Sequence, residues 1–176
     1  MGNKLALVIG LTGLLGACVL EHCSPTPAFA ADTHIGPSSA YPPASVTGFA
    51  SPAVSQDNIA TTVCVDGWTK TIRPPASYTN RIKAQQMTAW GLPGKLGDYE
   101  LDHFWSLEIG GDPRDPRNLW PQPYAGKYGA RVKDQVEDKL HRMVCSGTMK
   151  LVDAQACIAA DWVGCGVRIG AIKLAH

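Results

Sequence analysis

Three polar residues near the middle of the chain have the types and spacing that a metal-assisted hydrolase requires. Asp102 and His103 are adjacent, and Asn118 follows fifteen positions after the histidine. The glycine- and proline-rich segment between them predicts a loop joining two short strands, from about residue 100 to residue 121. A carboxylate binds hard cations, an imidazole accepts a proton near neutral pH, and a carboxamide can do either supporting task. We therefore predict a site with His103 as general base and Asp102 as metal ligand. Asn118 would either bind the metal or fix the imidazole ring.

Short motifs extend on both sides of these residues, from about residue 59 to residue 162. They are Cys64 to Thr69, Arg73-Pro74-Pro75, Ser77-Tyr78-Thr79, Leu107 to Gly111, Asp115 to Pro121, Lys133-Asp134, Leu140-His141 and Asp161-Trp162. With the Asp-His pair and the spaced Asn118-Leu119, they resemble the HNH endonucleases, the ββα-metal nuclease superfamily, and in particular its small secreted bacterial members. The resemblance implies an α+β fold with a core of one hairpin and one helix. It also implies a divalent metal, Mg²⁺ first with Mn²⁺ or Zn²⁺ as alternatives, and DNA or RNA as the partner.

The helix after the hairpin usually supplies a further ligand or phosphate contact in that superfamily, commonly from histidine or asparagine. The corresponding stretch here, YAGKYGARVKD, contains neither residue. Asp134, Glu137 and His141 are the nearest substitutes, and we predict that the metal shell is completed from among them. Glu137 and His141 are four positions apart and therefore share a helical face. As an alternative, His141 interacts with the negative end of the helix dipole, which we favour for this residue.

The net charge of +1 conceals a separation of charge along the chain. Residues 67–97 contain five basic residues and no acid, whereas residues 98–118 contain six acids and two arginines. A metal-dependent nuclease needs acids for the cation and bases for the phosphates. An ordinary solvated surface has the same composition, so charge alone does not distinguish the two. The predicted phosphate contacts are Arg114, Arg117, Lys70, Arg73, Arg81 and Lys83.

The first thirty residues have the pattern of a secretory signal peptide. Lys4 precedes an apolar run, and Ala28-Phe29-Ala30 forms a cleavage motif. This predicts a secreted or periplasmic bacterial protein without a stable membrane span after processing. A second interpretation is a lipoprotein box that ends at Cys18, which would carry a lipid anchor.

Cleavage after Ala30 leaves four cysteines, an even number that suits an oxidising compartment. Three pairings are open to four cysteines. We favour Cys64 with Cys145 and Cys157 with Cys165, because the last two are close together around one helix end. The spacings lack the Cys-x-x-Cys pattern of structural zinc sites.

The remaining segments predict one monomeric α+β domain over residues 59–176, preceded by a disordered linker. Residues 31–58 are rich in Pro, Ser and Ala and show no periodicity, which is typical of such a linker. Ser77 or Thr79 could cap the first helix. The other predicted elements are a hairpin over 60–72, helices over 80–90 and 130–145, and a short helix over 151–162.

These observations predict an exported metal-dependent endonuclease that hydrolyses phosphodiester bonds. One alternative is a non-catalytic protein of the same fold that binds nucleic acid or an envelope partner. Another is a disulfide-stapled structural domain in which the Asp-His pair is incidental. The helix distinguishes them, because an enzyme needs one of Asp134, Glu137 or His141 within reach of Asp102.

Overall fold

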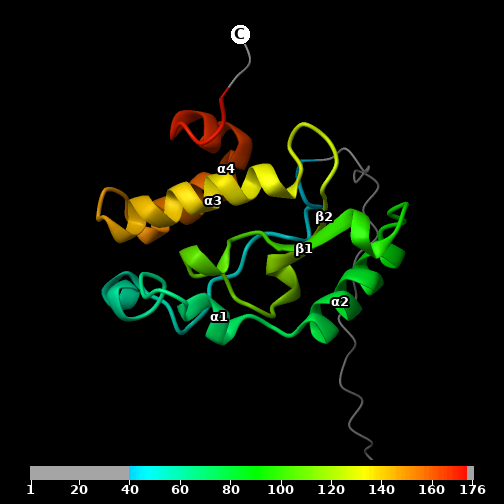
Figure 1. Cartoon of the computed structure of the whole chain (residues 1–176), viewed down its shortest axis with the longest axis horizontal. Helices are drawn as coiled ribbons and strands as arrows, with labels where there is room; N and C mark the ends of the chain where they lie inside the picture. Colours follow the sequence, from blue (N-terminus) through cyan, green and yellow to red (C-terminus); the bar gives the residue numbers. More distant parts are fainter. Residues whose placement is uncertain (1–39, 174–176) are drawn as a thin grey trace, which may run out of the picture.

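A two-stranded antiparallel sheet lies at the centre of the computed structural model, which describes residues 40–173 (Figure 1). Strand β1 (Tyr99–His103) pairs with β2 (Leu119–Pro123), so that His103 lies opposite Leu119. The hairpin predicted over residues 100–121 is therefore confirmed. The predicted α+β class is confirmed as well, because the other regular elements of residues 40–173 are helical.

Two helices cover the hairpin, α2 (Ala76–Ala89) on one face and α3 (Ala130–Cys145) on the other (Figure 1). Side chains alternate between the faces of a strand. Leu101 and Leu119 accordingly pack with Ile82 of α2, while Asp102 turns towards α3, where it meets Lys133. The hairpin is thus buried on both faces, and its end at His103 is held between the helices.

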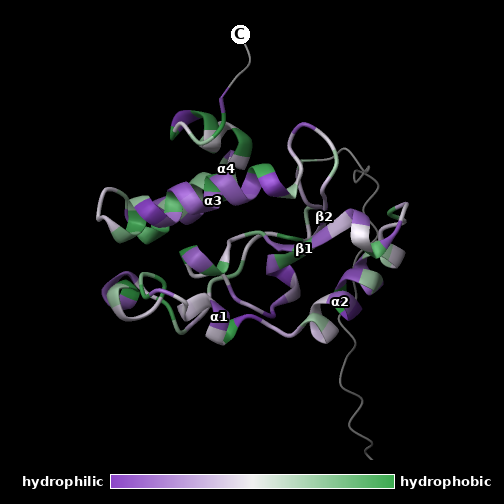
Figure 2. Cartoon of the chain, in the orientation of Figure 1, coloured by the Kyte–Doolittle hydropathy of each residue, from purple (hydrophilic) through white to green (hydrophobic). Residues whose placement is uncertain are grey.

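The last two helices pack against each other in the larger of the two apolar clusters. Helix α3 presents an apolar stripe that includes Val136, Leu140 and Val144, and Figure 2 shows polar and apolar residues alternating along it. Helix α4 (Leu151–Arg168) packs against α3. The sequence predicts α3 correctly but places the end of α4 too early, since the helix continues beyond a kink at Asp161.

The hairpin predicted over residues 60–72 is wrong. The chain instead forms a short 3₁₀ helix (Gln56–Thr61), a turn at Gly67 and helix α1 (Trp68–Ile72). The alternating β-branched residues that suggested strands have no strand partner, and tertiary contacts override such a weak preference. Helix α2 also begins earlier than predicted, after Pro75, so Ser77 and Thr79 lie inside its first turn.

The prediction of a disordered linker is wrong for residues 40–58. Val46 and Val54 are buried in the main core, and Ala50 forms a bridge with Gly111. The Trp162 indole N–H donates to the Ala40 carbonyl at 2.7 Å. These contacts are backbone bonds and single apolar anchors, which leave no periodic pattern in the sequence. Residues 1–39, with the predicted signal peptide and Cys18, lie outside the described residues.

Both predicted disulfides are present. Cys64–Cys145 joins the segment before α1 to the end of α3 across 81 positions, and Cys157–Cys165 spans eight positions within α4. Between residues 40 and 173, none of the helices has the length and apolar character needed to cross a membrane.

Replacing both cysteines of a pair with alanine should destabilise the protein, and by different amounts for the two disulfides. We expect the free energy of unfolding to fall by about 4 kcal/mol for Cys64–Cys145 and by about 2 kcal/mol for Cys157–Cys165, because the longer loop restricts the unfolded chain more. Urea unfolding of the two double variants measures this. Equal losses, or a larger loss at the shorter bridge, would contradict it.

Candidate active site

A cleft of about 360 Å³ opens where β1 ends against α3. His103 and Arg73 line it, together with Ser106 and Leu107 from the loop after β1. A second hollow of about 310 Å³ adjoins it and shares Arg73, Glu100 and His103. The cleft is strongly acidic. Its carboxylates are Glu100, Asp102, Glu108, Asp134, Glu137 and Asp138.

A buried lysine occupies the centre of this acidic wall. The Lys133 side chain is fully buried, and its Nζ lies 2.7 Å from Asp102 Oδ2, contacts Glu137 Oε1 and donates to the His103 carbonyl at 2.8 Å. Burial alone would lower the pKa of Lys133, but the two carboxylates reverse this and raise it above its ordinary value. The ammonium therefore stays charged and forms ion pairs with both Asp102 and Glu137, two carboxylates predicted from the sequence to bind a metal.

Sequence reasoning gave Lys133 no role, although a signal for it exists. Lys133 is in phase with Glu137, Leu140 and Val144 on the inner face of α3. A lysine within a buried stripe is uncommon and needs a partner, and Glu137 one turn later meets that need.

His103 is buried at the end of β1, with 5% of its surface exposed. Its Nε2 lies 3.2 Å from the Pro113 carbonyl, so in the neutral ring this nitrogen carries the proton and Nδ1 keeps a lone pair. Burial lowers the pKa of His103 to about 4 against the opposing charge of Asp102. The imidazole is therefore neutral at neutral pH, and its burial makes it a weaker proton acceptor than an exposed imidazole.

Glu100 and Asp134 also line the cleft, and neither forms an ion pair with Lys133. Burial first, then Asp102 and Asp134, raise the pKa of Glu100 to about 7. Burial and the charge of Asp102 also raise the pKa of Asp134. Within residues 40–173 neither carboxylate forms a salt bridge. Glu100 was missed from the sequence, although it lies two positions before Asp102 and hence on the same face of β1.

This donor set suits a hard cation with few protein ligands. Mg²⁺ is typically bound through one or two carboxylates, with waters and substrate oxygens completing its shell. Glu100 and Asp134 meet that requirement, and mutual repulsion among the cleft carboxylates is what a divalent cation would relieve. Among the described residues the cleft does not gather three potential ligand atoms within 4.8 Å of one another.

Asn118 differs from its predicted role. It is fully buried, and its amide is used by the backbone of the loop between the strands. Its Oδ1 accepts from the Trp105 N–H at 2.9 Å, and its Nδ2 donates to the carbonyls of Trp105 and Asp112 at 3.0 and 2.9 Å. Asn118 therefore neither lines the cleft nor contacts the ring of His103. It holds the loop that carries one wall of the cleft.

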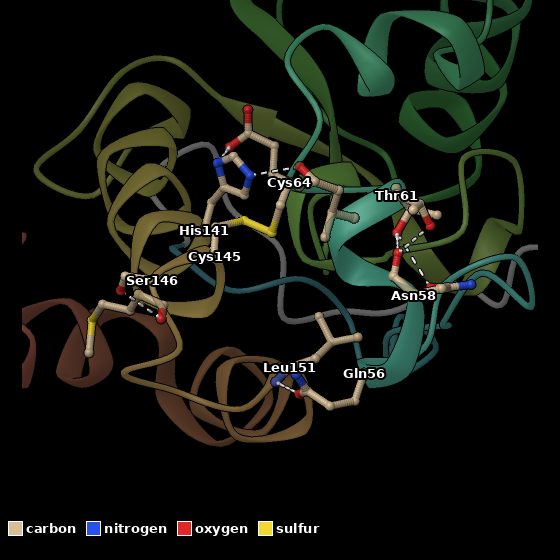
Figure 3. The surroundings of a disulfide bond; sticks show 12 residues. Gln56, Asn58, Thr61, Cys64, His141, Cys145, Ser146 and Leu151 are labelled. Atoms are coloured by element: carbon tan, nitrogen blue, oxygen red, sulfur yellow. Dashed lines mark hydrogen bonds and ion pairs between the residues drawn. A yellow bond between two sulfur atoms is a disulfide. The ribbon is translucent and has the colours of Figure 1, made fainter.

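His141 does not line the cleft either and lies beside the Cys64–Cys145 disulfide (Figure 3). Its Nε2 lies 2.8 Å from the Val63 carbonyl, and its Nδ1 lies 4.0 Å from Glu108 Oε2. Cys64, His141 and Cys145 are the one described group of at least three potential ligands within 4.8 Å. Both sulfurs are bonded to each other, so the oxidised cluster has only the imidazole to offer. His141 and Glu137 share a helix but turn to different partners.

Of the predicted phosphate contacts, Arg73 and Lys83 reach the site. Arg73 lines both the cleft and the adjoining hollow, and Lys83 lines the hollow. Lys70 is exposed on α1 and lines neither. The structure thus brings together two of the six predicted cations around His103.

The other arginines pack against aromatic rings. The Arg81 and Arg114 guanidinium carbons lie 5.4 and 4.8 Å from the Tyr78 ring centroid, and the Tyr78 hydroxyl donates to the Arg114 carbonyl at 2.8 Å. Arg117 forms a bidentate pair with Asp115, which occupies its guanidinium. Arg81 and Arg114 remain exposed.

Comparisons with protein-family models, curated proteins and solved structures find no match to this chain. The relationship to the HNH endonucleases therefore stays a prediction that rests on the motifs.

Replacing Lys133 with methionine should destabilise the protein, because two buried carboxylates lose their ion-pair partner. We expect the free energy of unfolding to fall by about 3–5 kcal/mol at pH 7, since Asp102 and Glu137 would lose their counter-charge. Adding Asp102→Asn and Glu137→Gln should restore part of the loss, whereas the control Lys139→Met on the same helix should change little. A fully stable Lys133→Met protein would show that the ion pairs contribute nothing.

His103 should make the protein less stable in acid. The unfolded ring binds its proton near pH 6.5 and the folded ring only near about pH 4, so the stability it contributes is present above about 6.5 and is lost as the pH falls towards 4. The wild-type free energy of unfolding falls between pH 7 and pH 4, and His103→Gln should make this fall smaller by about 3 kcal/mol. Urea unfolding across this range compares the two proteins, and identical pH slopes would mean that His103 titrates normally.

Proposed function

We propose that this protein is an exported, metal-dependent endonuclease that hydrolyses phosphodiester bonds in DNA or RNA. One observation carries the proposal: the neutral, buried imidazole of His103 lines the same cleft as Glu100 and Asp134, two carboxylates that form no salt bridge within residues 40–173. Arg73 at the junction of the two hollows supplies a guanidinium for a phosphate.

Each of these residues has a defined task in the hydrolysis. His103 accepts a proton from the attacking water at Nδ1, while the Pro113 carbonyl keeps Nε2 protonated and fixes the ring. Arg73 binds the phosphate and orients it. Glu100 and Asp134 would hold the metal, which supplies positive charge to stabilise the phosphoryl and leaving oxygens.

Lys133 contributes to this arrangement without touching the substrate. Its bond to the His103 carbonyl and its ion pair with Asp102 fix the end of β1. Its charge also opposes protonation of His103, as does that of Arg73. Lys133 is therefore a positioning residue that keeps the base neutral.

A second candidate function is non-catalytic binding of nucleic acid. Asp102 and Glu137 are both ion-paired with Lys133, so fewer carboxylates are left for a metal than the motifs imply. A binding module needs only cations such as Arg73, Arg81 and Arg114 near the cleft, and it needs no metal. Cleavage activity separates this function from the first.

The oxidised protein should cut plasmid DNA or RNA in the presence of Mg²⁺ or Mn²⁺ and should stop when a chelator is added. His103→Ala should lower the rate by roughly 10²- to 10⁴-fold, the range for loss of a positioned base. Glu100→Gln and Asp134→Asn should raise the metal concentration needed for half-maximal activity, whereas Asp153→Asn, an exposed acid on α4 outside the cleft, should behave like wild type.

Circular dichroism and urea unfolding must first show that each variant is folded. Absence of metal-dependent cleavage by the wild-type protein on both substrates would favour the binding function. Full activity of His103→Ala would exclude His103 as the base.

A further inference from the structure

The hollow beside the acidic cleft has a different chemical character. One wall is a face of α2 made by Ala76, Thr79, Asn80 and Lys83, at the spacing of successive helical turns. Tyr124, which follows β2, forms part of the opposite wall. Because this hollow shares His103 with the cleft, whatever occupies it lies next to the reacting bond.

Lys83 is a buried cation whose charge has no carboxylate bound to it. Only 9% of its surface is exposed, and its Nζ donates to the Tyr99 carbonyl at 2.7 Å. An ammonium has three N–H donors, and within residues 40–173 Lys83 forms no salt bridge. Lysines this deeply buried are normally paired. An anion in the hollow would supply the missing partner.

Tyr124 and Asn80 add the groups that a nucleobase requires. The Tyr124 side chain is 40% exposed, with the Arg131 guanidinium carbon 5.5 Å from its ring centroid. An aromatic ring of this kind stacks on any base, and a nearby arginine strengthens such contacts. Asn80 is exposed, and its amide, which can both donate and accept, makes no hydrogen bond within the described residues.

We propose that this hollow binds one unpaired nucleotide of a single-stranded nucleic acid, adjacent to the phosphate that is cut. Its phosphate is held by Lys83 and Arg73, and its base stacks on Tyr124. A base within a duplex is paired and stacked, so it enters a side hollow only after it is extruded at a cost. The inference rests on the proposed nuclease function and specifies single strands as the preferred substrate.

Binding is measured separately from cleavage, by fluorescence anisotropy of a labelled oligothymidylate and of a duplex of equal length, in chelator. The wild-type protein should bind the single strand more tightly than the duplex. Tyr124→Ala should weaken single-strand binding by about 10- to 100-fold and leave duplex binding unchanged. Lys83→Met should reduce the slope of log affinity against log salt by roughly 0.7 on the single strand. Lys150→Met, an exposed cation outside both hollows, is the matched control.

The arms of the experiment have distinct outcomes. Tyr124 is exposed, so its variant tests the hollow even if Lys83→Met unfolds. Equal affinity of the wild-type protein for the single strand and the duplex would overturn the inference. Unchanged single-strand binding by Tyr124→Ala would overturn it as well. Adding Mg²⁺ to the same mixtures tests the nuclease function, and a selective single-strand binder that cuts nothing would refute that function while retaining the hollow.

Discussion

The buried ammonium of Lys133 is the interaction on which the rest of the candidate site depends. It is the point where α3 is joined to the end of β1, through Asp102 and the carbonyl of His103. A charge in this position is costly unless all its partners are present, so the three groups constrain one another closely. The constraint holds the backbone of His103 at the end of β1, and it decides which acids of the cleft pair with the ammonium.

The loop between the strands is held by a different device, a single buried carboxamide. Asn118 satisfies backbone donors and acceptors on both sides of the loop, where regular structure supplies none. Gly111 permits the close approach, because a Cβ there would lie 1.7 Å from the Trp105 carbonyl oxygen. The segment around Ala50 then pairs with the same loop. The loop that forms this wall of the cleft is thus held by polar bonds to the backbone as well as by the buried side chains of Leu107 and Ile109.

Charge is distributed unevenly around His103, although Arg73 and Glu100 line both the cleft and the adjoining hollow. On the α3 side, carboxylates repel one another, and this raises the pKa of Glu100 and Asp134 in addition to the effect of their burial. On the α2 side, Lys83 and Arg73 carry positive charge with no carboxylate bound to either. The α3 side is therefore complementary to a cation and the α2 side to a polyanion, and His103 lies between the two.

The sequence alone determined the elements whose signal is local. The amphipathic stripe predicts α3 because apolar side chains must share one face, and the glycine- and proline-rich loop predicts the hairpin that ends at His103. Cysteine parity and spacing led to the pairing of Cys64 with Cys145 and of Cys157 with Cys165. What only the tertiary structure decided are the partners of polar groups. These partners come from distant segments of the chain. Lys133 lies between Asp102 and Glu137, Asn118 bonds within the loop, and residues 40–58 pack against that loop. A carboxylate has the same sequence signature whether it faces a metal or a lysine, because its partner is chosen by the packing of the elements in space.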